Sequence, residues 1–341
     1  MNSKHHILII YSLKSSFVRQ DIDALKANYI VSEYEFGIQR ELSQAIAQFR
    51  LLFFLIRNAS KYVAIYTWFA DYHSLLPAIL TRIFKFKLIL AIGGFDAAKI
   101  KELGYGVHIN FIRSKIVKYA VRKAHFIIFS SKFTYNQLVK NTNVRINRNR
   151  YEIIYPGIHS KFNRLIIRDI KYLMIYVAAG DSINRMKVKG VDRFLELAKK
   201  MTDFQFLLIG PDGAAAKWVM ENKSDNVSYI KSIEREELFQ YYEASKFIAL
   251  FSRFEAFGMV LLEGISAGCK PITLSNLGSE EIVNQFGDFG KVFNTFDSHE
   301  ISEYLKSYSS SDGDFADIQY YLNKFPDNKR AERINNFLSQ V

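Results

Sequence analysis

Two glutamates, Glu255 and Glu263, are the residues whose type and spacing most clearly suggest chemistry. They bracket a segment that follows an apolar strand predicted at Phe247–Ser252 and opens a helix predicted at Met259–Ala267. Gly258, between them, lets backbone approach a ligand closely, and the first N–H groups of a helix stabilise an anion such as a phosphate. Carboxylates flanking that position can accept hydrogen bonds from sugar or ribose hydroxyls. The segment therefore predicts a sugar-nucleotide site.

A basic stretch provides a second candidate. It follows a strand predicted at Leu173–Ala178 and runs from Gly180 to Lys189, with Arg185 and Lys187 between them. A diphosphate leaving group needs positive charge nearby, because negative charge builds on it as the bond to it breaks. The alternative is that the stretch is a solvated basic loop leading into the next helix.

Short apolar strands alternate with helical stretches throughout the chain, and the pattern begins again after Pro156. The strands predicted before it are His6–Tyr11, Tyr29–Phe36, Tyr62–Thr67, Leu88–Ile92, Phe126–Ser130 and Glu152–Tyr155, and those after it are Leu173–Ala178, Phe204–Ile209, Val227–Ile230, Phe247–Ser252, Pro271–Leu274 and Lys291–Phe293. This alternation predicts right-handed βαβ units and parallel sheets. The fold class is therefore α/β, with two Rossmann-like units facing each other across a cleft.

The length of 341 residues also favours two domains. We place them at residues 1–165 and 166–321, with a polar linker around Ser160–Lys171. Residues 322–341, which contain a helix predicted at Asn328–Leu338, are expected to join the first domain.

Composition is that of a globular protein, with 49% hydrophobic and 23% charged residues. The single cysteine, Cys269, excludes an intramolecular disulfide, fits a reducing compartment and is interpreted as a small core residue. The apolar runs near the start and at Leu51–Ile56 are too short for a signal peptide or a membrane span. We therefore expect a cytoplasmic chain.

Charge is distributed unevenly along the chain. Residues 1–160 hold 23 Lys/Arg against 9 Asp/Glu, a net charge of +14, whereas residues 161–341 hold 23 against 25, a net charge of −2. A basic half points to an anionic partner, either a membrane surface or a nucleic acid.

No metal site is predicted. An Asp-x-Asp pattern occurs in the low-complexity loop Ser309–Asp314 and again at Asp21 and Asp23. The loop has no preceding strand to orient its carboxylates, and the second pair lies in a helical stretch where the two side chains diverge.

Several motifs occur in one order: Asn226–Ile230, Phe251–Gly258, Leu262-Glu263, Ala267–Pro271 and Gly278–Val283. Their series resembles the donor-binding half of the retaining glycosyltransferases of family 4 (glycosyl transferases group 1), which have the two-domain GT-B fold. The resemblance covers residues 172–283 well and the first half less securely. The resemblance implies an enzyme that uses a nucleotide-sugar as substrate and needs no cofactor.

The resemblance also implies roles for particular residues. Glu255 would lie by the donor sugar and Glu263 would hydrogen-bond the ribose. The backbone of Phe257, Gly258 and Met259 would line the sugar and phosphates.

The diphosphate would be held by bases at the strand end and the helix start. Lys189, before Gly190, matches the Lys-Gly of the family, but its Gly-Arg is absent because Asp181 follows Gly180. Arg185 is the best substitute. Gly210 lies in a turn that is near the nucleobase in related enzymes, although a structural role comes first.

Two segments of the first half follow predicted strands, where open α/β sheets form ligand crevices. Gly93 and Gly94 would let backbone approach a ligand, and Asp96 or His73 could contact acceptor hydroxyls. A structural histidine in an aromatic corner is an equal alternative for His73. No Ser/His/Asp or Cys/His arrangement is visible, and we name no general base.

The helix predicted at Ile109–Lys123 carries part of the basic charge. Ile112, Ile116 and Ala120 share one side of a helical wheel. The cluster on the other side consists of Lys115, Lys118 and Arg122. This pattern suits contact with an anionic membrane, and the alternative is an ordinary solvated helix packed on the sheet.

The resemblance therefore implies a metal-independent retaining glycosyltransferase, and the basic first half adds the expectation that it is peripheral on the inner face of a membrane. Its donor would be a UDP- or GDP-sugar and its acceptor a glycan or lipid-linked sugar of cell-surface polysaccharide or lipopolysaccharide synthesis. One alternative is a non-catalytic GT-B-fold binding protein. A nucleic-acid-binding protein is less favoured, because no recognition motif accompanies the charge.

Overall fold

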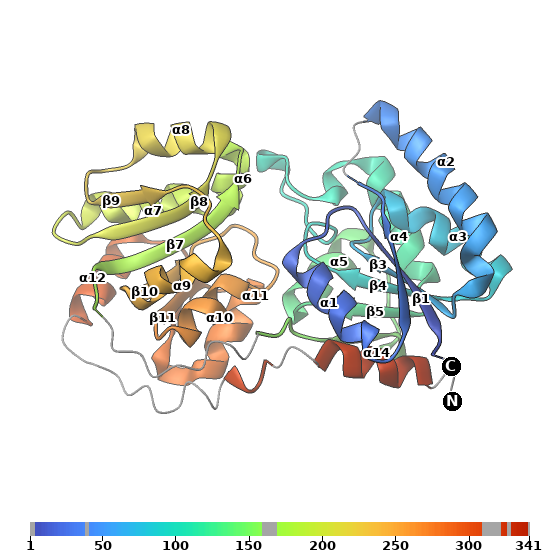
Figure 1. Cartoon of the computed structure of the whole chain (residues 1–341). Coiled ribbons are helices and arrows are strands. Elements are labelled where there is room, and N and C mark those ends of the chain that lie inside the picture. Colours follow the sequence, from blue (N-terminus) through green and yellow to red (C-terminus); the bar gives the residue numbers. More distant parts are fainter. Residues whose placement is uncertain (1–3, 38–40, 159–168, 309–321, 326–328, 340–341) are drawn as a thin grey trace. The chain divides into compact units, whose positions relative to one another are not determined.

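The computed structural model describes all residues except 1–3, 38–40, 159–168, 309–321, 326–328 and 340–341 (Figure 1). The chain divides into two compact units. Unit 1 comprises Met1–Lys101, Gly106–Gly157 and Asp327–Val341, and unit 2 comprises Glu102–Tyr105 and Ile158–Pro326. Most of the predicted linker Ser160–Lys171 and the whole loop Ser309–Asp314 lie outside the described residues.

Unit 1 is built on a six-stranded parallel sheet in the order β2-β1-β3-β4-β5-β6. Its strands are β1 His6–Tyr11, β2 Ile30–Glu35, β3 Ala64–Trp68, β4 Lys87–Ile92, β5 Phe126–Phe129 and β6 Tyr151–Ile153. Its helices are α1 Ser16–Lys26, α2 Glu41–Asn58, α3 Leu75–Phe84, α4 Phe111–Lys123, α5 Lys132–Thr142 and α14 Lys329–Ser339.

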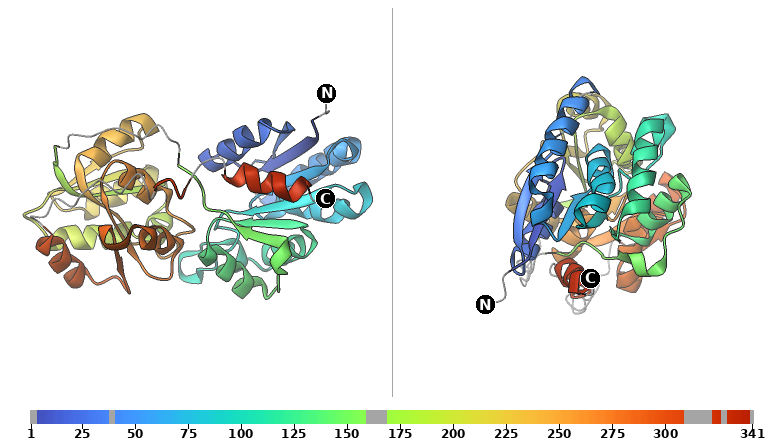
Figure 2. Two further views of the ribbon diagram at one scale, coloured as in Figure 1. Left: turned by 90° about the horizontal axis from the view of Figure 1, so that it is seen from below. Right: turned by 90° about the vertical axis from the view of Figure 1, so that its right-hand side faces the viewer.

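Alternate residues of β1 show how the helices are layered. Ile7 and Ile9 pack with residues of α1 and α14, whereas Leu8 and Ile10 pack with residues of α2 and α3 on the opposite face. The helix α14 lies beside α1 although it comes from the other end of the chain (Figures 1 and 2). Both faces of the sheet are therefore covered by helices.

A buried ion pair fastens α14 to unit 1. The Nε atom of Arg330 lies 2.9 Å from Oδ1 of Asp21 in α1, and both side chains are almost fully buried. The hydroxyl of Tyr66 donates to the other carboxylate oxygen at 2.5 Å. The guanidinium also donates to the carbonyl of Ile154 at 3.1 Å and lies 4.9 Å from the ring of Trp68. The charges of Asp21 are thus matched inside the core, as burial requires.

Unit 2 contains a second six-stranded parallel sheet, in the order β12-β11-β10-β7-β8-β9. Its strands are β7 Tyr172–Gly180, β8 Phe206–Pro211, β9 Val227–Ile230, β10 Ser245–Leu250, β11 Lys270–Leu274 and β12 Lys291–Phe293. Its helices are α6 Ile183–Val188, α7 Val191–Lys200, α8 Gly213–Asn222, α9 Arg235–Glu243, α10 Met259–Ser266, α11 Gly278–Val283 and α12 Ser298–Ser307.

All twelve predicted strands are present and the α/β class is confirmed. The basic loop expected between Gly180 and Lys189 is instead the short helix α6. Ser182 caps this helix by accepting a hydrogen bond from the N–H of Arg185 at 3.4 Å, and Met186 is buried beneath it. In the part of the chain that the structure describes, no helix is long and apolar enough to cross a membrane.

Candidate functional site

The turn between β10 and α10 has the form that the sequence predicts for an anion site. Gly258 is the N-cap residue of the helix, with a φ of 98°, and as a glycine it has no side chain with which to cap α10. A Cβ atom on Gly258 would lie 2.9 Å from Cδ1 of Leu250 and 3.2 Å from Cβ of Ser279. Both the backbone conformation and the space therefore favour glycine. The first amide groups of a helix without a capping side chain suit an anionic ligand.

Glu255 and Lys189 form an ion pair beside this turn. The Nζ atom of Lys189 lies 3.0 Å from Oε2 of Glu255, and the side chains are 29% and 10% exposed. Burial is the largest effect and lowers the pKa of Lys189, but the charge and hydrogen bond of Glu255, together with Tyr105, raise it more, so the pKa lies above its ordinary value. The ammonium group is therefore charged at neutral pH and remains partly accessible. The structure brings together two residues predicted separately.

The backbone at Lys189 is fixed by a buried tyrosine. The hydroxyl of Tyr176, on β7, donates to the carbonyl of Lys189 at 2.5 Å and accepts from the N–H of Phe251 at 2.8 Å. Gly190 has a φ of 76°, and a Cβ there would lie 2.2 Å from the carbonyl oxygen of Phe251. Lys189 is thus held against the end of β10 by contacts that only glycine at the next position permits.

Arg253 provides a second tie. The guanidinium of Arg253 donates to both carboxylate oxygens of Asp192, at 2.8 and 2.7 Å. The backbone N–H of Arg253 donates to the carbonyl of Val188 at 2.8 Å. This bidentate pair joins the turn before α10 to the start of α7. The sequence analysis missed the roles of Arg253 and Tyr176. The only signal for Arg253 was its place within the motif at 251–258.

Arg185 lies on α6, close to the glycine that ends β7. A Cβ on Gly180 would lie 2.7 Å from Cδ of Arg185, so the arginine side chain crosses the glycine. Arg185 is exposed, and its charge lowers the pKa of Lys189, although less than Glu255 raises it. The charge of Arg185 therefore acts on Lys189, and a joint role of the two cations at one anion stays a prediction.

Glu263 lies on α10 in the interior of unit 2. It is 9% exposed, and its Oε2 atom accepts a hydrogen bond from the hydroxyl of Tyr242 at 3.1 Å. The tyrosine therefore orients the carboxylate. Glu263 is on the same turn-and-helix element as Glu255, as expected from their spacing.

Of the remaining donor-side residues, Phe257 and Met259 lie around the same loop, and Gly210 lies on β8. Phe257 is buried, whereas Met259 is half-buried at the first position of α10. The N–H of Gly278, at the start of α11, donates to the carbonyl of Glu255 at 2.8 Å and braces the loop. Gly210, the residue before the last of β8, has a φ of 115° and packs against the backbone of Ala178, which accounts for it structurally.

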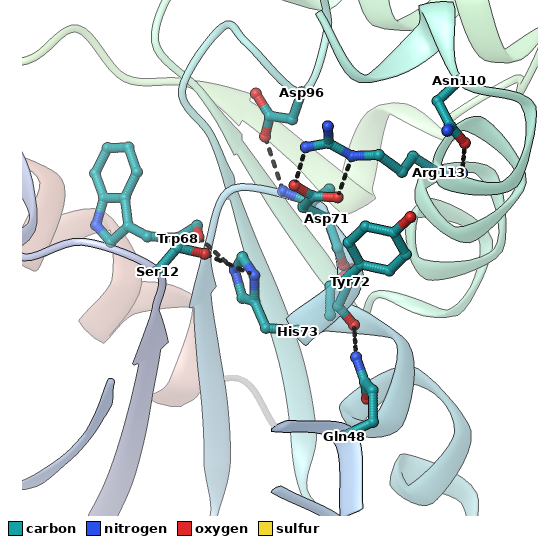
Figure 3. Close-up of polar contacts among 11 residues, drawn as sticks. Ser12, Gln48, Trp68, Asp71, Tyr72, His73, Asp96, Asn110 and Arg113 are labelled. Carbon is teal, nitrogen blue, oxygen red and sulfur yellow. Dashed lines mark hydrogen bonds and ion pairs between the residues drawn. The ribbon is translucent and has the colours of Figure 1, made fainter. Parts of the chain in front are cut away.

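In unit 1, Asp96 joins the loops that follow β3 and β4 (Figure 3). Its Oδ1 atom accepts from the N–H groups of Gly93 and Gly94 at 3.1 and 2.8 Å, and Oδ2 accepts from Ala70 at 2.9 Å. The side chain is fully buried. These contacts give Asp96 a positioning role, and direct contact with an acceptor stays a prediction.

The burial of Asp96 predicts a pH-dependent stability. Burial raises its pKa from about 3.8 to about 7, against the opposing effect of the backbone donors. Between about pH 4 and pH 7 the folded chain therefore binds more protons than the unfolded chain, and stability falls as pH rises through this window. Relative to Asp96→Asn, the wild type should lose up to about 4 kcal/mol of unfolding free energy across it.

Denaturant unfolding at several pH values measures this difference. Asp23→Asn, which changes an exposed carboxylate on α1, is the control. Parallel pH profiles for wild type and Asp96→Asn would contradict the prediction.

His73 is also buried in this part of unit 1. Its Nε2 atom lies 2.7 Å from the carbonyl oxygen of Trp68, and Nδ1 lies 3.1 Å from the hydroxyl of Ser12 (Figure 3). Burial lowers its pKa, so the ring is neutral, with Nε2–H donating to the carbonyl and Nδ1 accepting from the serine. The contacts agree with the structural alternative for His73, and an acceptor contact stays untested.

An ion pair that the sequence analysis missed lies next to these residues. The Nε atom of Arg113, on α4, donates to Oδ1 of Asp71 at 3.0 Å, and the guanidinium makes a second contact with the other oxygen (Figure 3). The same guanidinium lies 5.6 and 5.3 Å from the rings of Tyr72 and Phe95. Phe69, with a φ of 67°, is a strained non-glycine residue in the same loop. Such strain is typical of ligand sites, so this edge of unit 1 is a second candidate site.

The membrane-surface candidates lie on α4. Lys115 and Arg122 are exposed and Lys118 is half-buried. Ile112 is 62% exposed, so the alternative in which its side of the helix packs on the sheet does not hold for this residue. The buried side of α4 consists of Val117, Ala120 and Val121.

Among the described residues, no three His, Cys, Asp or Glu side chains are grouped to hold a metal ion.

Comparison with solved structures defines the class of fold. Sucrose-phosphate synthase from Thermosynechococcus elongatus matches with a TM-score of 0.79 at 16% identity, covering 98% of each chain. Anabaena HepE in complex with UDP and glucose matches with a TM-score of 0.75 at 16% identity, covering 99% of this chain and 100% of that chain. The glycosyltransferase WaaG, involved in lipopolysaccharide biosynthesis, matches with a TM-score of 0.68 at 13% identity, covering 98% and 100%. The chain has the GT-B fold.

Sequence comparison then narrows the relationship. Residues 165–324, which contain both glutamates, Lys189 and Arg185, match the family described as glycosyl transferases group 1. A glycosyltransferase of Methanocaldococcus jannaschii described as uncharacterized is 29% identical over 221 residues. That match covers 63% of this chain and 56% of the relative, so the chain spans little more than half of the relative's length.

Proposed function

We propose that this protein is a retaining glycosyltransferase that moves a sugar from a UDP- or GDP-sugar to a glycan or lipid-linked acceptor. The observation that carries the proposal is the charged pair of Lys189 and Glu255 beside the uncapped N-terminus of α10. This arrangement lies within the segment that matches glycosyl transferases group 1. The UDP bound to HepE supports a nucleotide-sugar donor.

In this proposal the diphosphate binds where positive charge converges. The first amides of α10 donate hydrogen bonds to its oxygens, and the helix dipole adds to the attraction. Lys189 turns from Glu255 toward the phosphates, and Arg185 approaches from α6. As the sugar–phosphate bond breaks, the leaving diphosphate gains negative charge, so these cations stabilise the transition state more than the ground state.

The two glutamates recognise the hydroxyl-bearing parts of the donor. Glu263 accepts hydrogen bonds from the ribose, in an orientation that Tyr242 fixes. Glu255 lies by the donor sugar. The backbone of Phe257, Gly258 and Met259 lines the sugar and the phosphates, and Gly258 lets them approach closely.

The transfer of the sugar needs no nucleophile from the protein. The bond from the sugar anomeric carbon to the diphosphate oxygen breaks, and the electron pair leaves with the nucleoside diphosphate. The acceptor hydroxyl oxygen bonds to the same carbon on the same face, and its proton passes to the departing phosphate. Retention of configuration follows from this same-face attack. No cofactor is required, and the nucleotide-sugar is a substrate.

The acceptor site is proposed at the edge of unit 1. Gly93 and Gly94, held by Asp96, give a loop on which an acceptor can bind, and Asp71 with Arg113 supplies charged groups at its border. The role of WaaG suggests the pathway, which would be the synthesis of cell-surface polysaccharide or lipopolysaccharide. The location would be cytoplasmic, on the inner face of the membrane.

One observation favours a second candidate, a non-catalytic GT-B-fold protein that binds a nucleotide or glycan. Asp181 stands where the family has an arginine, and it is exposed after the end of β7. Such a protein would bind the nucleotide and catalyse no transfer. A nucleic-acid-binding protein has no comparable support.

A ligand screen with an activity readout tests the proposed function. In a thermal-shift panel of UDP-, GDP- and ADP-sugars, we expect only the sugars of one nucleotide base to raise the melting temperature of the protein. A ligand that binds the folded state alone has this effect. Donor consumption and transfer should persist in a chelator, because side chains and amides rather than a metal ion meet the diphosphate charge.

Binding without transfer to any glycan or lipid-linked acceptor would favour the non-catalytic candidate. Loss of activity in chelator, restored by a divalent ion, would contradict metal independence. No shift with any donor would contradict the nucleotide site itself.

A further inference from the structure

The outward face of α2 is apolar although it faces solvent. We call the outer stripe the set of Ile46, Phe49, Phe53 and Ile56, which are 57%, 73%, 57% and 54% exposed. Their spacing of three and four residues places them on one side of the helix. A large apolar helix face in water is unfavourable, and it commonly marks an interaction surface.

The opposite side of α2 already accounts for packing on the sheet. Ala47, Leu51 and Leu55 are buried in the core shared with β1 and α3. The packing of α2 on the sheet therefore does not explain why the residues of the outer stripe are apolar. Another interaction must explain them.

The neighbouring helices extend the stripe. The helices α2, α3 and α4 pack side by side in that order on one face of the unit 1 sheet (Figure 1). On α3, Ile79 and Ile83 are 41% and 67% exposed, and on α4, Phe111 and Ile112 are 71% and 62% exposed. Of the fourteen large apolar side chains found exposed among the described residues, eight lie on these three helices. The exposed apolar groups are thus concentrated on one layer.

The same layer is strongly basic. After Glu41, the first residue of α2, none of the three helices contains an aspartate or glutamate. The basic residues on or directly after them are Arg50, Arg57, Lys61, Arg82, Lys85, Arg113, Lys115, Lys118, Arg122 and Lys123. Arg57 lies 4.1 Å from the ring of Phe53, and Lys115 lies 4.3 Å from the ring of Phe111. Cations and exposed rings are therefore interleaved rather than separated.

We propose that the outer face of α2, α3 and α4 docks on the surface of an anionic lipid bilayer, with the outer stripe inserted among the acyl chains. Phenylalanine and isoleucine lose their contact with water on insertion, while arginine and lysine beside them reach the phosphate groups of the lipids. An anionic bilayer therefore accounts for both the exposed apolar side chains and the basic side chains. The proposal does not depend on sugar transfer, although such docking would hold the enzyme near a lipid-linked acceptor.

The charge and the exposed apolar side chains of this surface favour a bilayer over two other partners. A protein partner would need a complementary acidic surface, and apart from Glu41 at the start of α2 the three helices offer no acidic group with which to fix its register. A nucleic acid would match the charge and could stack on the rings. It would leave the four exposed isoleucines of α2 and α3 without an apolar environment.

Vesicle flotation of the full chain tests the proposal. Wild type should float with vesicles of phosphatidylglycerol and phosphatidylcholine, bind pure phosphatidylcholine at least tenfold less, and be released as salt rises. The double variant Phe49→Ser/Phe53→Ser should lower partitioning by roughly 30-fold or more, because two large apolar side chains are lost. Arg50→Gln/Arg57→Gln should lower it by roughly 30-fold on anionic vesicles only.

The matched control is Lys217→Gln/Met220→Ser, which removes an exposed cation and an exposed apolar residue from α8 of unit 2. It should float as wild type does. All variants change exposed side chains, so their melting temperatures should stay within about two degrees of wild type, which separates loss of docking from unfolding.

Three results would overturn the proposal. The first is equal flotation of the Phe49→Ser/Phe53→Ser variant and wild type, and the second is equal binding of wild type to neutral and anionic vesicles. The third is that a single-stranded oligonucleotide displaces wild type from vesicles and no longer binds the Phe49→Ser/Phe53→Ser variant. The last result would assign the surface to nucleic acid. Nucleotide-sugar binding in the thermal-shift screen is read separately, so failure of docking leaves the proposed transfer intact.

Discussion

Replacing Lys189 with methionine is expected to lower kcat/KM for sugar transfer by roughly 10²- to 10³-fold, the usual effect of removing one preorganised donor to developing negative charge. The ammonium group is held 3.0 Å from Glu255 and is charged, so it is ready to exchange the carboxylate for a phosphate. Methionine fills similar volume without the charge. Steady-state rates with a saturating acceptor measure the change.

A loss of activity could also arise because the variant leaves Glu255 buried without its cation. The double variant Lys189→Met/Glu255→Gln removes that unpaired charge, and it should stay as inactive as the single variant. Lys199→Ala, an exposed lysine at the end of α7, is the matched control and should retain full activity. Recovery of transfer in the double variant would reduce Lys189 to a structural counterion.

The second large effect is expected at Glu263. The variant Glu263→Gln keeps the size of the side chain and an oxygen that can accept from Tyr242, but it removes the charge. Hydrogen bonds to a charged acceptor contribute about 1.5–3 kcal/mol each, so donor affinity should fall by roughly 10- to 100-fold. Calorimetry with the nucleoside diphosphate selected by the ligand screen measures this loss.

The assignment to ribose can be tested directly with a deoxy ligand. Wild type should bind the nucleoside diphosphate more tightly than its 2′,3′-dideoxy analogue, and Glu263→Gln should lose that discrimination. Glu221→Gln, an exposed glutamate on α8, should behave as wild type. If the variant still discriminates between the two ligands, Glu263 does not bind the ribose.

Most of the fold follows from the order of apolar runs. Strands of a parallel sheet are buried on both faces, so segments such as Leu88–Ile92 read as continuous apolar runs and are recognised easily. The short helix α6 was missed because it has only six residues and a basic surface. Its cap, Ser182, and its buried Met186 become informative only when the helix is packed on β7.

The site was predicted less evenly. Glu255, Glu263 and Lys189 could be proposed because each lies in a recognisable local motif, whereas the pairing of Lys189 with Glu255 joins residues far apart in sequence. Tyr176 reads as an ordinary core tyrosine, since its hydroxyl contacts are made only in the folded chain. The pair of Asp71 and Arg113 was missed for the same reason.

The exposed side of unit 1 shows a different limit. An amphipathic pattern identifies the packed face of a helix when the other face is polar. The helix α2 is apolar on both sides, and the sequence alone does not say which side meets the sheet. On α4 the wheel groups Ile112 with Ala120, but only the folded structure shows that Ile112 is exposed and Ala120 is buried.

The helix α14 has a consequence for how the protein is made. Unit 1 contains β1 to β6, yet its core also contains Ile334, and Arg330 supplies the partner of the buried Asp21. A ribosome must therefore synthesise the whole of unit 2 before unit 1 can close. During translation the nascent unit 1 exposes the surface of α1 that α14 later covers, together with an unmatched carboxylate. Final folding of unit 1 is thus timed by the last helix rather than by its own sheet.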